Sequence, residues 1–200
     1  MTSRNLRRRF LRSNLMLYKK GMRILAVEDG PLDKSGRGVL VVGIMGRVGT
    51  IEGIISFRIE ADGNDATEKL AKAIKKSRFR EQIRLIAFNG ITLAGLNFLD
   101  VPAFYKTFRL PIIAITRKKP HPELLKKAIV KSGIEPEKKI RLLNSILGSV
   151  TVKKVGGFYV QGVGLEEGNL KGILENSFEM LRLAHLIARG VETGESKGRL

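Results

Sequence analysis

The sequence predicts a single α/β domain built on one mixed β-sheet. Three segments rich in β-branched residues follow one another between residues 23 and 60 with short connections, which is typical of an antiparallel meander. Helical and strand-like segments then alternate between residues 65 and 117, which indicates parallel strands joined by helical crossovers. The 200 residues, 43% of them hydrophobic, suffice for one domain with a sizeable core.

The antiparallel part contains three predicted strands. They are RILAVED at 23–29, GVLVVGIMG at 38–46 and TIEGIISFRIE at 50–60. Isoleucine and valine recur in each, and their branched side chains favour extended backbone. Glycine-bearing turns such as Gly46-Arg47-Val48-Gly49 separate the strands, so neighbours are expected to run in opposite directions.

The parallel part begins with a helix predicted over 65–77. Leu70 and Ile74 lie four residues apart on one face, and Asp65 and Glu68 have the spacing of a capping box. A strand, a helix and a second strand follow at 83–88, 100–108 and 111–117. Because each of these strands is reached through a helix, we expect them to be parallel.

The last third adds helices around a β-hairpin. Two basic helices are predicted at 122–133 and 136–147, a glycine-rich hairpin at 149–164, and two closing helices at 168–178 and 179–190. The whole order is that of a ribonuclease-H-like mixed sheet flanked by helices, with an extra C-terminal hairpin and helices. In such a sheet the first strand is central and lies beside the fourth.

The composition limits the kinds of partner and of metal site that the chain can have. The chain has 37 Lys and Arg against 19 Asp and Glu, a formal net charge of +18, which favours a polyanionic partner, with nucleic acid as the leading candidate. With no cysteine and only two distant histidines, a metal site must rely on oxygen ligands. The longest apolar run, Val39–Met45, is too short to span a membrane, so we expect a cytoplasmic protein without a membrane partner.

The chain begins with a basic segment. Residues 1–22 are predicted to form an N-terminal arm and residues 23–200 the single ribonuclease-H-like domain. The arm contains Arg7, Arg8 and Arg9 and no acidic residue. We expect these three arginines to contact phosphates. The alternative is that the segment is a dispensable leader, and both interpretations stay open.

Acidic residues gather where the predicted strands end. Strand one ends in Glu28-Asp29, and the fourth strand, which lies beside it, ends at Asn89. Carboxylates at such strand ends can hold Mg²⁺, with Mn²⁺ as a substitute, for phosphodiester hydrolysis. The acids available are Glu28, Asp29, Asp62, Asp65 and Glu68. Asp65 and Glu68 are also consistent with a helix cap, and both roles can coexist.

Basic and aromatic residues follow the later strands. Arg117, Lys118 and Lys119 end the strand at 111–117 and are candidates for phosphate contacts, or for a solvated loop. Phe158 and Tyr159 could stack on an exposed base, or pack within the hairpin. His185 lies among apolar helical residues and is interpreted as a core histidine.

Five collinear segments carry a resemblance to a known family. They are VEDGPLDK at 27–34, DGNDATEKL at 62–70, QIRLIAFNGITLAGLNFLDV at 82–101, PIIAITRKKP at 111–120 and LRLAHLIARG at 181–190. Together they resemble the archaeal endonuclease dU-like family, a relative of endonuclease V, over residues 22–198. The resemblance implies a ribonuclease-H-like fold and a magnesium-dependent nick in DNA near a deaminated base. It implies deoxyuridine as the lesion.

The chain departs from the family pattern at two positions. That pattern has two aspartates at the end of strand one and Asp-Gly-Ile-Thr after strand four, where this chain has Glu28-Asp29 and Asn89. Asp65 matches the third acidic position. We therefore expect Glu28, Asp65 and Asn89 at the catalytic positions, with Asp29 or Asp62 supporting the metal. Because Asn89 offers only a neutral oxygen, both a weakened endonuclease and an inactive nucleic-acid-binding module stay open.

Overall fold

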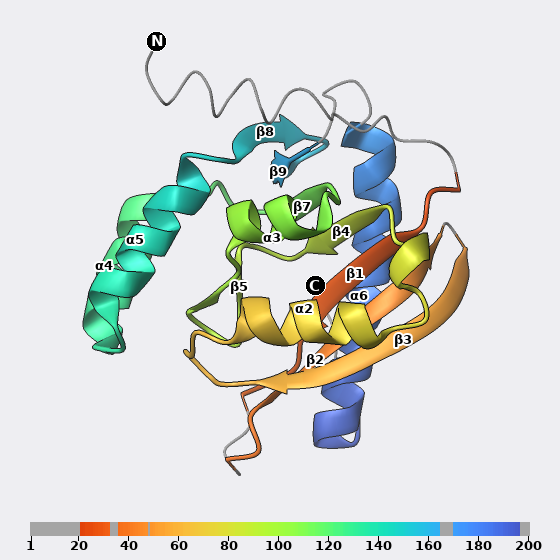
Figure 1. Cartoon of the computed structure of the whole chain (residues 1–200), viewed down its shortest axis with the longest axis horizontal. Helices are drawn as coiled ribbons and strands as arrows, with labels where there is room; N and C mark the ends of the chain where they lie inside the picture. Colours follow the sequence, from red (N-terminus) through yellow and green to blue (C-terminus); the bar gives the residue numbers. More distant parts are fainter. Residues whose placement is uncertain (1–20, 33–35, 48, 165–169, 197–200) are drawn as a thin grey trace.

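A seven-stranded mixed sheet forms the centre of the protein. The computed structural model describes residues 21–32, 36–47, 49–164 and 170–196 (Figure 1). The strand order is β3-β2-β1-β4-β7-β9-β8. In chain order the strands are β1 (Ile24–Asp29), β2 (Val39–Arg47), β3 (Thr50–Ile59), β4 (Leu85–Phe88), β7 (Ile112–Thr116), β8 (Thr151–Val155) and β9 (Phe158–Val163). The predicted basic arm lies almost wholly outside the described residues.

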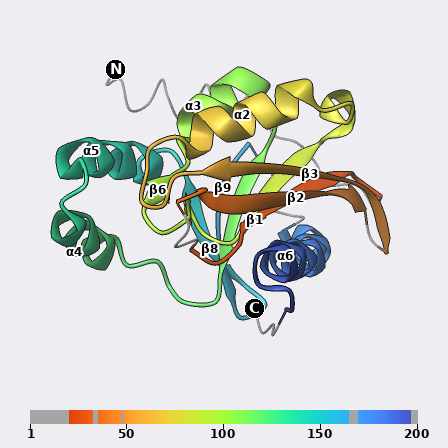
Figure 2. The same ribbon diagram turned by 90° about the horizontal axis from the view of Figure 1, so that it is seen from below.

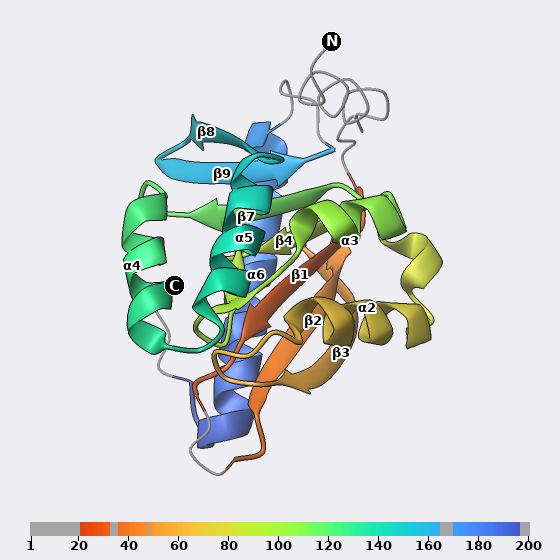
Figure 3. The ribbon, with the colours of Figure 1, turned by 60° about the vertical axis from the view of Figure 1, so that its left-hand side comes forward.

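The pairing directions confirm the predicted sheet. β1, β2 and β3 form an antiparallel meander, while β4 and β7 run parallel to β1. β1 is therefore central and lies beside β4, as in a ribonuclease-H-like sheet. The C-terminal hairpin extends this same sheet, because β9 pairs antiparallel with β7 (Figure 3).

Five α-helices in the described part of the chain surround the sheet. α2 (Ala66–Lys76) and α3 (Val101–Phe108) cover one face, and α6 (Leu170–Thr193) covers the other (Figure 2). α4 (Pro122–Ser132) and α5 (Pro136–Leu147) lie together at one end. Three short elements complete the chain, η1 (Arg80–Gln82), β5 (Thr92–Leu93) and β6 (Asn97–Phe98). None of the described helices is long and apolar enough to cross a membrane.

The two predicted closing helices are one continuous helix. α6 contains no glycine or proline between residues 173 and 189, so nothing in its sequence interrupts the helical hydrogen bonds. Its buried residues recur at helical spacing along the whole length and pack on β1 and β2. The helix therefore covers the sheet as a single rod.

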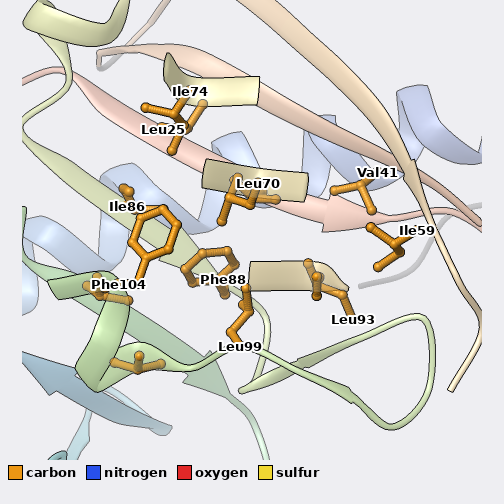
Figure 4. Packing of buried hydrophobic residues seen from close by; sticks show 14 of the residues in the cluster. Leu25, Val41, Ile59, Leu70, Ile74, Ile86, Phe88, Leu93, Leu99 and Phe104 are labelled. Carbon is orange, nitrogen blue, oxygen red and sulfur yellow. The ribbon is translucent and has the colours of Figure 1, made fainter. Parts of the chain in front are cut away.

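The core has two layers because the central strands are buried on both faces. Leu25 and Val27 of β1 pack with Leu70 of α2, as do Ile86 and Phe88 of β4 (Figure 4). The alternate residues of the same strands pack against α6 in a second cluster. A third, smaller cluster attaches α4 and α5 to the sheet. The period of two along each strand thus decides which face each side chain serves.

We expect a glycine at the β2–β3 bulge to be irreplaceable. The register shifts between Met45 and Gly46, where a Cβ atom on Gly46 would lie 2.2 Å from the carbonyl oxygen of Thr50. Because this neighbour is backbone, Gly46→Ala should cost about 1–3 kcal/mol of unfolding free energy in urea. Gly190→Ala is the control, since α6 leaves open space there and alanine should stabilise the helix by about 0.5–1 kcal/mol. Equal effects of the two changes would contradict this account.

Candidate functional site

A row of side chains crosses the carboxyl ends of the three parallel strands. Val27 pairs with Phe88, and Phe88 pairs with Ala114, so the residues that follow these three lie side by side. They are Glu28, Asn89 and Ile115. Because Val27 and Phe88 belong to the core under α2, the alternation turns Glu28 and Asn89 toward α6.

Glu28 is a buried acid at the centre of this row. Its side chain is 3% exposed, and its Oε1 atom has no hydrogen-bond partner among the described residues. Burial raises the pKa of Glu28 to about 8, and the charge of Asp29 adds to this effect. A hydrogen bond with the side chain of Asn89 has a weaker, opposite effect on this pKa. Asn89 itself is exposed. The fold therefore favours the protonated form of this carboxyl over a wider pH range than that of an exposed glutamate.

Asp29, the next residue, points to the opposite face of the sheet. Its Oδ2 atom accepts a hydrogen bond of 2.8 Å from the backbone N–H of Ala94. Burial raises the pKa of Asp29, while this bond and the charge of His185 lower it. His185 is half-buried on α6.

Asp62 and Asp65, the other two predicted metal ligands, accept hydrogen bonds from backbone N–H groups. Asp65 accepts hydrogen bonds at Oδ1 from the N–H of Glu60 at 3.1 Å and from Nδ2 of Asn97 at 2.7 Å. Asp62 accepts one at Oδ1 from the N–H of Leu96 at 2.7 Å. The structure therefore brings Glu28 and Asn89 together, and it uses Asp62 and Asp65 to shape the neighbouring loops.

The predicted capping box at the start of α2 is wrong. The Asp65 side chain makes no capping bond; instead, Oδ1 of Asn97 accepts a 3.0 Å hydrogen bond from the N–H of Ala66. Asn97 is fully buried and also donates to the carbonyl oxygen of Glu60. Asn97 is not among the site residues predicted from the sequence, although an asparagine within the apolar run LNFL is a signal of a buried polar role.

A buried lysine connects α5 to the strand ends. Lys139 has no exposed surface, and its Nζ donates to the carbonyl oxygen of Asp62. Burial lowers the pKa of Lys139, while the charges of Asp62 and Glu135 raise it. Asp62 also donates its N–H to the Ala94 carbonyl at 2.8 Å, and Ala94 in turn binds Asp29. This chain of contacts, which sequence analysis missed, anchors α5 to the loop beside Asp29.

Oxygen donors for a divalent cation are few at this row. Mg²⁺ is commonly bound through one or two carboxylates, waters and substrate phosphates. Glu28, with its unpartnered Oε1, and the side-chain oxygen of Asn89 supply two oxygens at adjacent positions. No three His, Asp or Glu side chains within the described ranges form a group that could hold a metal ion. The arrangement does not fit a pair of metal ions.

A pocket opens beside Asn89. It has a volume of about 300 Å³. Its lining residues come from the ends of β4 and β7, the start of β9, and α6: Asn89, Ile115, Thr116, Arg117, Lys118, Phe158, Phe178 and Leu181. The pocket is thus mostly apolar, with an amide and two basic groups at its border.

Two aromatic rings hold a guanidinium group at this pocket. The ring centroids of Phe158 and Phe178 are 5.1 Å apart, and Cζ of Arg117 lies 5.7 Å and 5.6 Å from them respectively. Such cation–π contacts orient an arginine side chain without neutralising its charge. Arg117 therefore keeps donors available for an anionic or carbonyl-bearing ligand.

The predicted nucleic-acid contacts divide into three groups. Arg117, Lys118 and Phe158 line the pocket, and Lys119 is the exposed next residue. Tyr159 is half-buried, pairs with Thr116 across the sheet and is not part of the lining. Arg7, Arg8 and Arg9 lie outside the described residues. Sequence analysis missed Phe178, because only the docking of α6 brings it here.

Fold and site together define the class of protein. It is a ribonuclease-H-like α/β protein with an acid and an amide adjacent at the ends of its central strands. Comparison with known proteins gives the family. The chain belongs to the endonuclease dU family, whose model matches residues 20–192.

Relatives match nearly their whole length. A UPF0215 protein of Thermococcus sibiricus is 36% identical over 190 residues, covering 90% of this chain and 96% of the relative. One of Archaeoglobus fulgidus is 32% identical over 186 residues, covering 90% and 99%. A crystal structure of a protein of unknown function from Archaeoglobus fulgidus matches with a TM-score of 0.75 at 28% identity, covering 86% of this chain and 98% of that one.

We expect Glu28 to make stability depend on pH. A carboxyl whose pKa rises from 4.5 in the unfolded chain to about 8 stabilises the fold below pH 4.5 and loses that contribution as the pH rises through 8. Glu28→Gln removes the titration, so its unfolding free energy relative to wild type should rise between pH 5 and pH 9. Urea unfolding at pH 5, 7 and 9 measures this.

The exposed Glu68 supplies the control for that experiment. Glu68→Gln should follow the wild type at every pH. Parallel profiles for wild type and Glu28→Gln would show that Glu28 is already ionised at neutral pH.

We expect Asn97 to stabilise the loops around the site. Asn97→Ala removes its bonds to Ala66, Glu60 and Asp65, and should cost about 2–4 kcal/mol because buried partners lose their bonds. Asn144→Ala, on the exposed side of α5, is the matched control and should change stability by about 0.5 kcal/mol at most. Chemical unfolding compares the two, and equal losses would argue against the role of Asn97.

Proposed function

We propose that this chain is an endonuclease that cleaves DNA at or near a deaminated base. The observation that carries the proposal is the position of the Glu28–Asn89 row directly beside a pocket with basic and aromatic residues. A reactive row and a binding pocket that share Asn89 can act on adjacent parts of one substrate. Membership of the endonuclease dU family supports the same reaction class, and its name suggests deoxyuridine.

The pocket suits an unpaired base. Its volume of about 300 Å³ and its apolar walls suit a flat heterocycle. Phe158 and Phe178 offer ring surface, and stacking of a base on an aromatic side chain is worth about 1–3 kcal/mol. A base must leave the helix to enter such a pocket, which costs least where pairing is already weakened, as at a deaminated base.

The basic residues suit the charged backbone. Arg117 and Lys118 border the pocket and can contact the phosphate next to an inserted base. The formal net charge of +18 adds a long-range attraction to any nucleic acid. These contacts would orient the strand so that a phosphodiester lies near Glu28.

Glu28 supplies the proton chemistry of the row. With a pKa of about 8, its carboxyl can hold a proton at neutral pH or accept one, which is the behaviour that general acid–base catalysis requires. Asn89 hydrogen-bonds to this carboxyl and can also donate to a phosphate oxygen. A bound Mg²⁺ or Mn²⁺, held by these two side chains, would offset the charge that develops on the phosphate.

A specific observation favours a second candidate function. The described residues contain no group of three acids or histidines able to hold a metal ion, and Asn89 adds no charge to Glu28. Such a site would bind cations weakly and cut slowly. The second candidate is therefore a nucleic-acid-binding module that has lost cleavage.

A nicking assay tests the proposal. The substrates are oligonucleotides that carry one deoxyuridine, one deoxyinosine or no lesion, each with Mg²⁺ or Mn²⁺. We expect slow nicking of the lesion-bearing strands, at least about 100-fold less in Glu28→Gln, and more in Asn89→Asp because a second carboxylate tightens cation binding. Asp65→Asn is the control and should keep its response to the cation, since that carboxylate binds backbone.

The outcomes separate the two candidates. Nicking by Glu28→Gln at the wild-type rate would remove this row from the reaction. If neither wild type nor Asn89→Asp cuts while both bind the oligonucleotide, the binding module is the better description.

A further inference from the structure

The outward face of α4 mixes lysines with exposed aliphatic side chains. Leu124, Val130 and Ile134 are 62%, 61% and 42% exposed, and the neighbouring Lys127 and Lys131 are also exposed. These five residues are called the α4 stripe. Large exposed aliphatics gathered in one short segment of a highly charged protein indicate an interaction surface.

Helical spacing puts the four helical residues of the stripe on one side of α4. Residues 130 and 131 lie three and four positions after 127, and 124 lies one turn before 127. Ile134 follows the Gly133 cap, just beyond the end of the helix. The opposite side of the helix packs through Ile129 and Leu125 onto the sheet and α5. The stripe is therefore the surface that α4 leaves uncovered.

The charges of the stripe are not used within the fold. Lys126, Lys138 and Arg141 on the same pair of helices each form an ion pair with a glutamate three or four residues away. Lys127 and Lys131 form no ion pair with any residue of the described ranges. Two uncompensated charges on successive turns favour an anionic partner.

α4 follows the border of the pocket along the chain. Residues 117–121 connect the carboxyl end of β7 to the first turn of α4, and they begin with Arg117, Lys118 and Lys119. α4 is the next element along the chain and adds two more lysines.

We infer that the α4 stripe binds the unpaired DNA strand that flanks the base held in the pocket. Lys127 and Lys131 lie about 6 Å apart along the helix axis and can contact neighbouring phosphates. Leu124, Val130 and Ile134 offer apolar contacts to the sugars and unstacked bases between them. This inference rests on the proposed function and extends it from one nucleotide to the flanking strand.

The experiment compares two lysine pairs that change the net charge equally. Lys127→Ala with Lys131→Ala, and Lys72→Ala with Lys76→Ala on α2, each lower the formal charge from +18 to +16, since 37 − 2 − 19 = 16. Lys72 and Lys76 are exposed and four residues apart, on a helix that covers the face opposite α6 (Figure 2). They reproduce the spacing and charge of the α4 pair away from the pocket.

Binding is measured by fluorescence anisotropy across a salt series. The probe is a labelled single-stranded oligodeoxynucleotide with one central deoxyuridine, without divalent cation so that no strand is cut. Each phosphate contact to a single strand contributes about 0.7 to the slope of log K against log salt. The slope should therefore fall in magnitude by about 1.4 in the α4 pair and stay at the wild-type value in the α2 pair. Unfolding in urea checks that both pairs stay folded.

Substituting the aliphatic residues should change binding in a different way from substituting the lysines. Leu124→Gln with Val130→Gln removes apolar contacts without changing charge, so binding should weaken about equally at every salt concentration and the slope should not change. Wild-type affinity in this variant would show that the aliphatics do not touch the strand.

The outcomes distinguish this inference from the proposed function. Equal slopes in the two lysine pairs would overturn the inference and show that only net charge matters. A wild-type slope in the α4 pair would also overturn it and assign the stripe to another partner, such as an acidic protein. In either case cleavage by the wild type in the nicking assay leaves the proposed function intact. A wild type that neither binds nor nicks removes both.

Discussion

The parallel pairing of β1 with β4 is the constraint on which the rest of the structure depends. It aligns Val27 with Phe88, and so it makes Glu28 and Asn89 neighbours on one face. A shift of β1 by one residue would turn Glu28 to the other face of the sheet, away from Asn89 and α6. Burial of β1 on both faces opposes such a shift. Leu25 and Val27 would move from the cluster under α2 to the cluster under α6, and Ala26 would move the other way. The site is thus as stable as the central sheet.

The acidic residues near the strand ends serve different purposes because they differ in what they bind. Asp29, Asp62 and Asp65 each accept a hydrogen bond from a backbone N–H group. These bonds maintain the shape of the surrounding loops. Glu28 has an oxygen atom without such a partner. A group that is costly to bury and keeps an oxygen atom without a partner is a candidate for chemistry.

The sequence predicts the fold better than it predicts the site. Period-two and helical patterns act over a few residues, and they predict nearly every strand and helix, as well as the proximity of Glu28 and Asn89. The errors lie where distant residues decide. Asn97 replaces Asp65 as the cap of α2 from 31 positions away, and Lys139 reaches Asp62 across 77 positions. Local sequence patterns do not predict contacts between residues so far apart. For the same reason they do not predict that Phe178 lies at the pocket.

The two rings that hold Arg117 have a consequence for the order in which the protein is made. Arg117 follows β7, whereas Phe158 begins β9 and Phe178 belongs to α6. Synthesis proceeds from the N-terminus, so Glu28 and Asn89 emerge long before the aromatic wall exists. A nascent chain has the acid and the amide but no pocket beside them. The pocket is therefore assembled after the strand ends that carry Glu28 and Asn89.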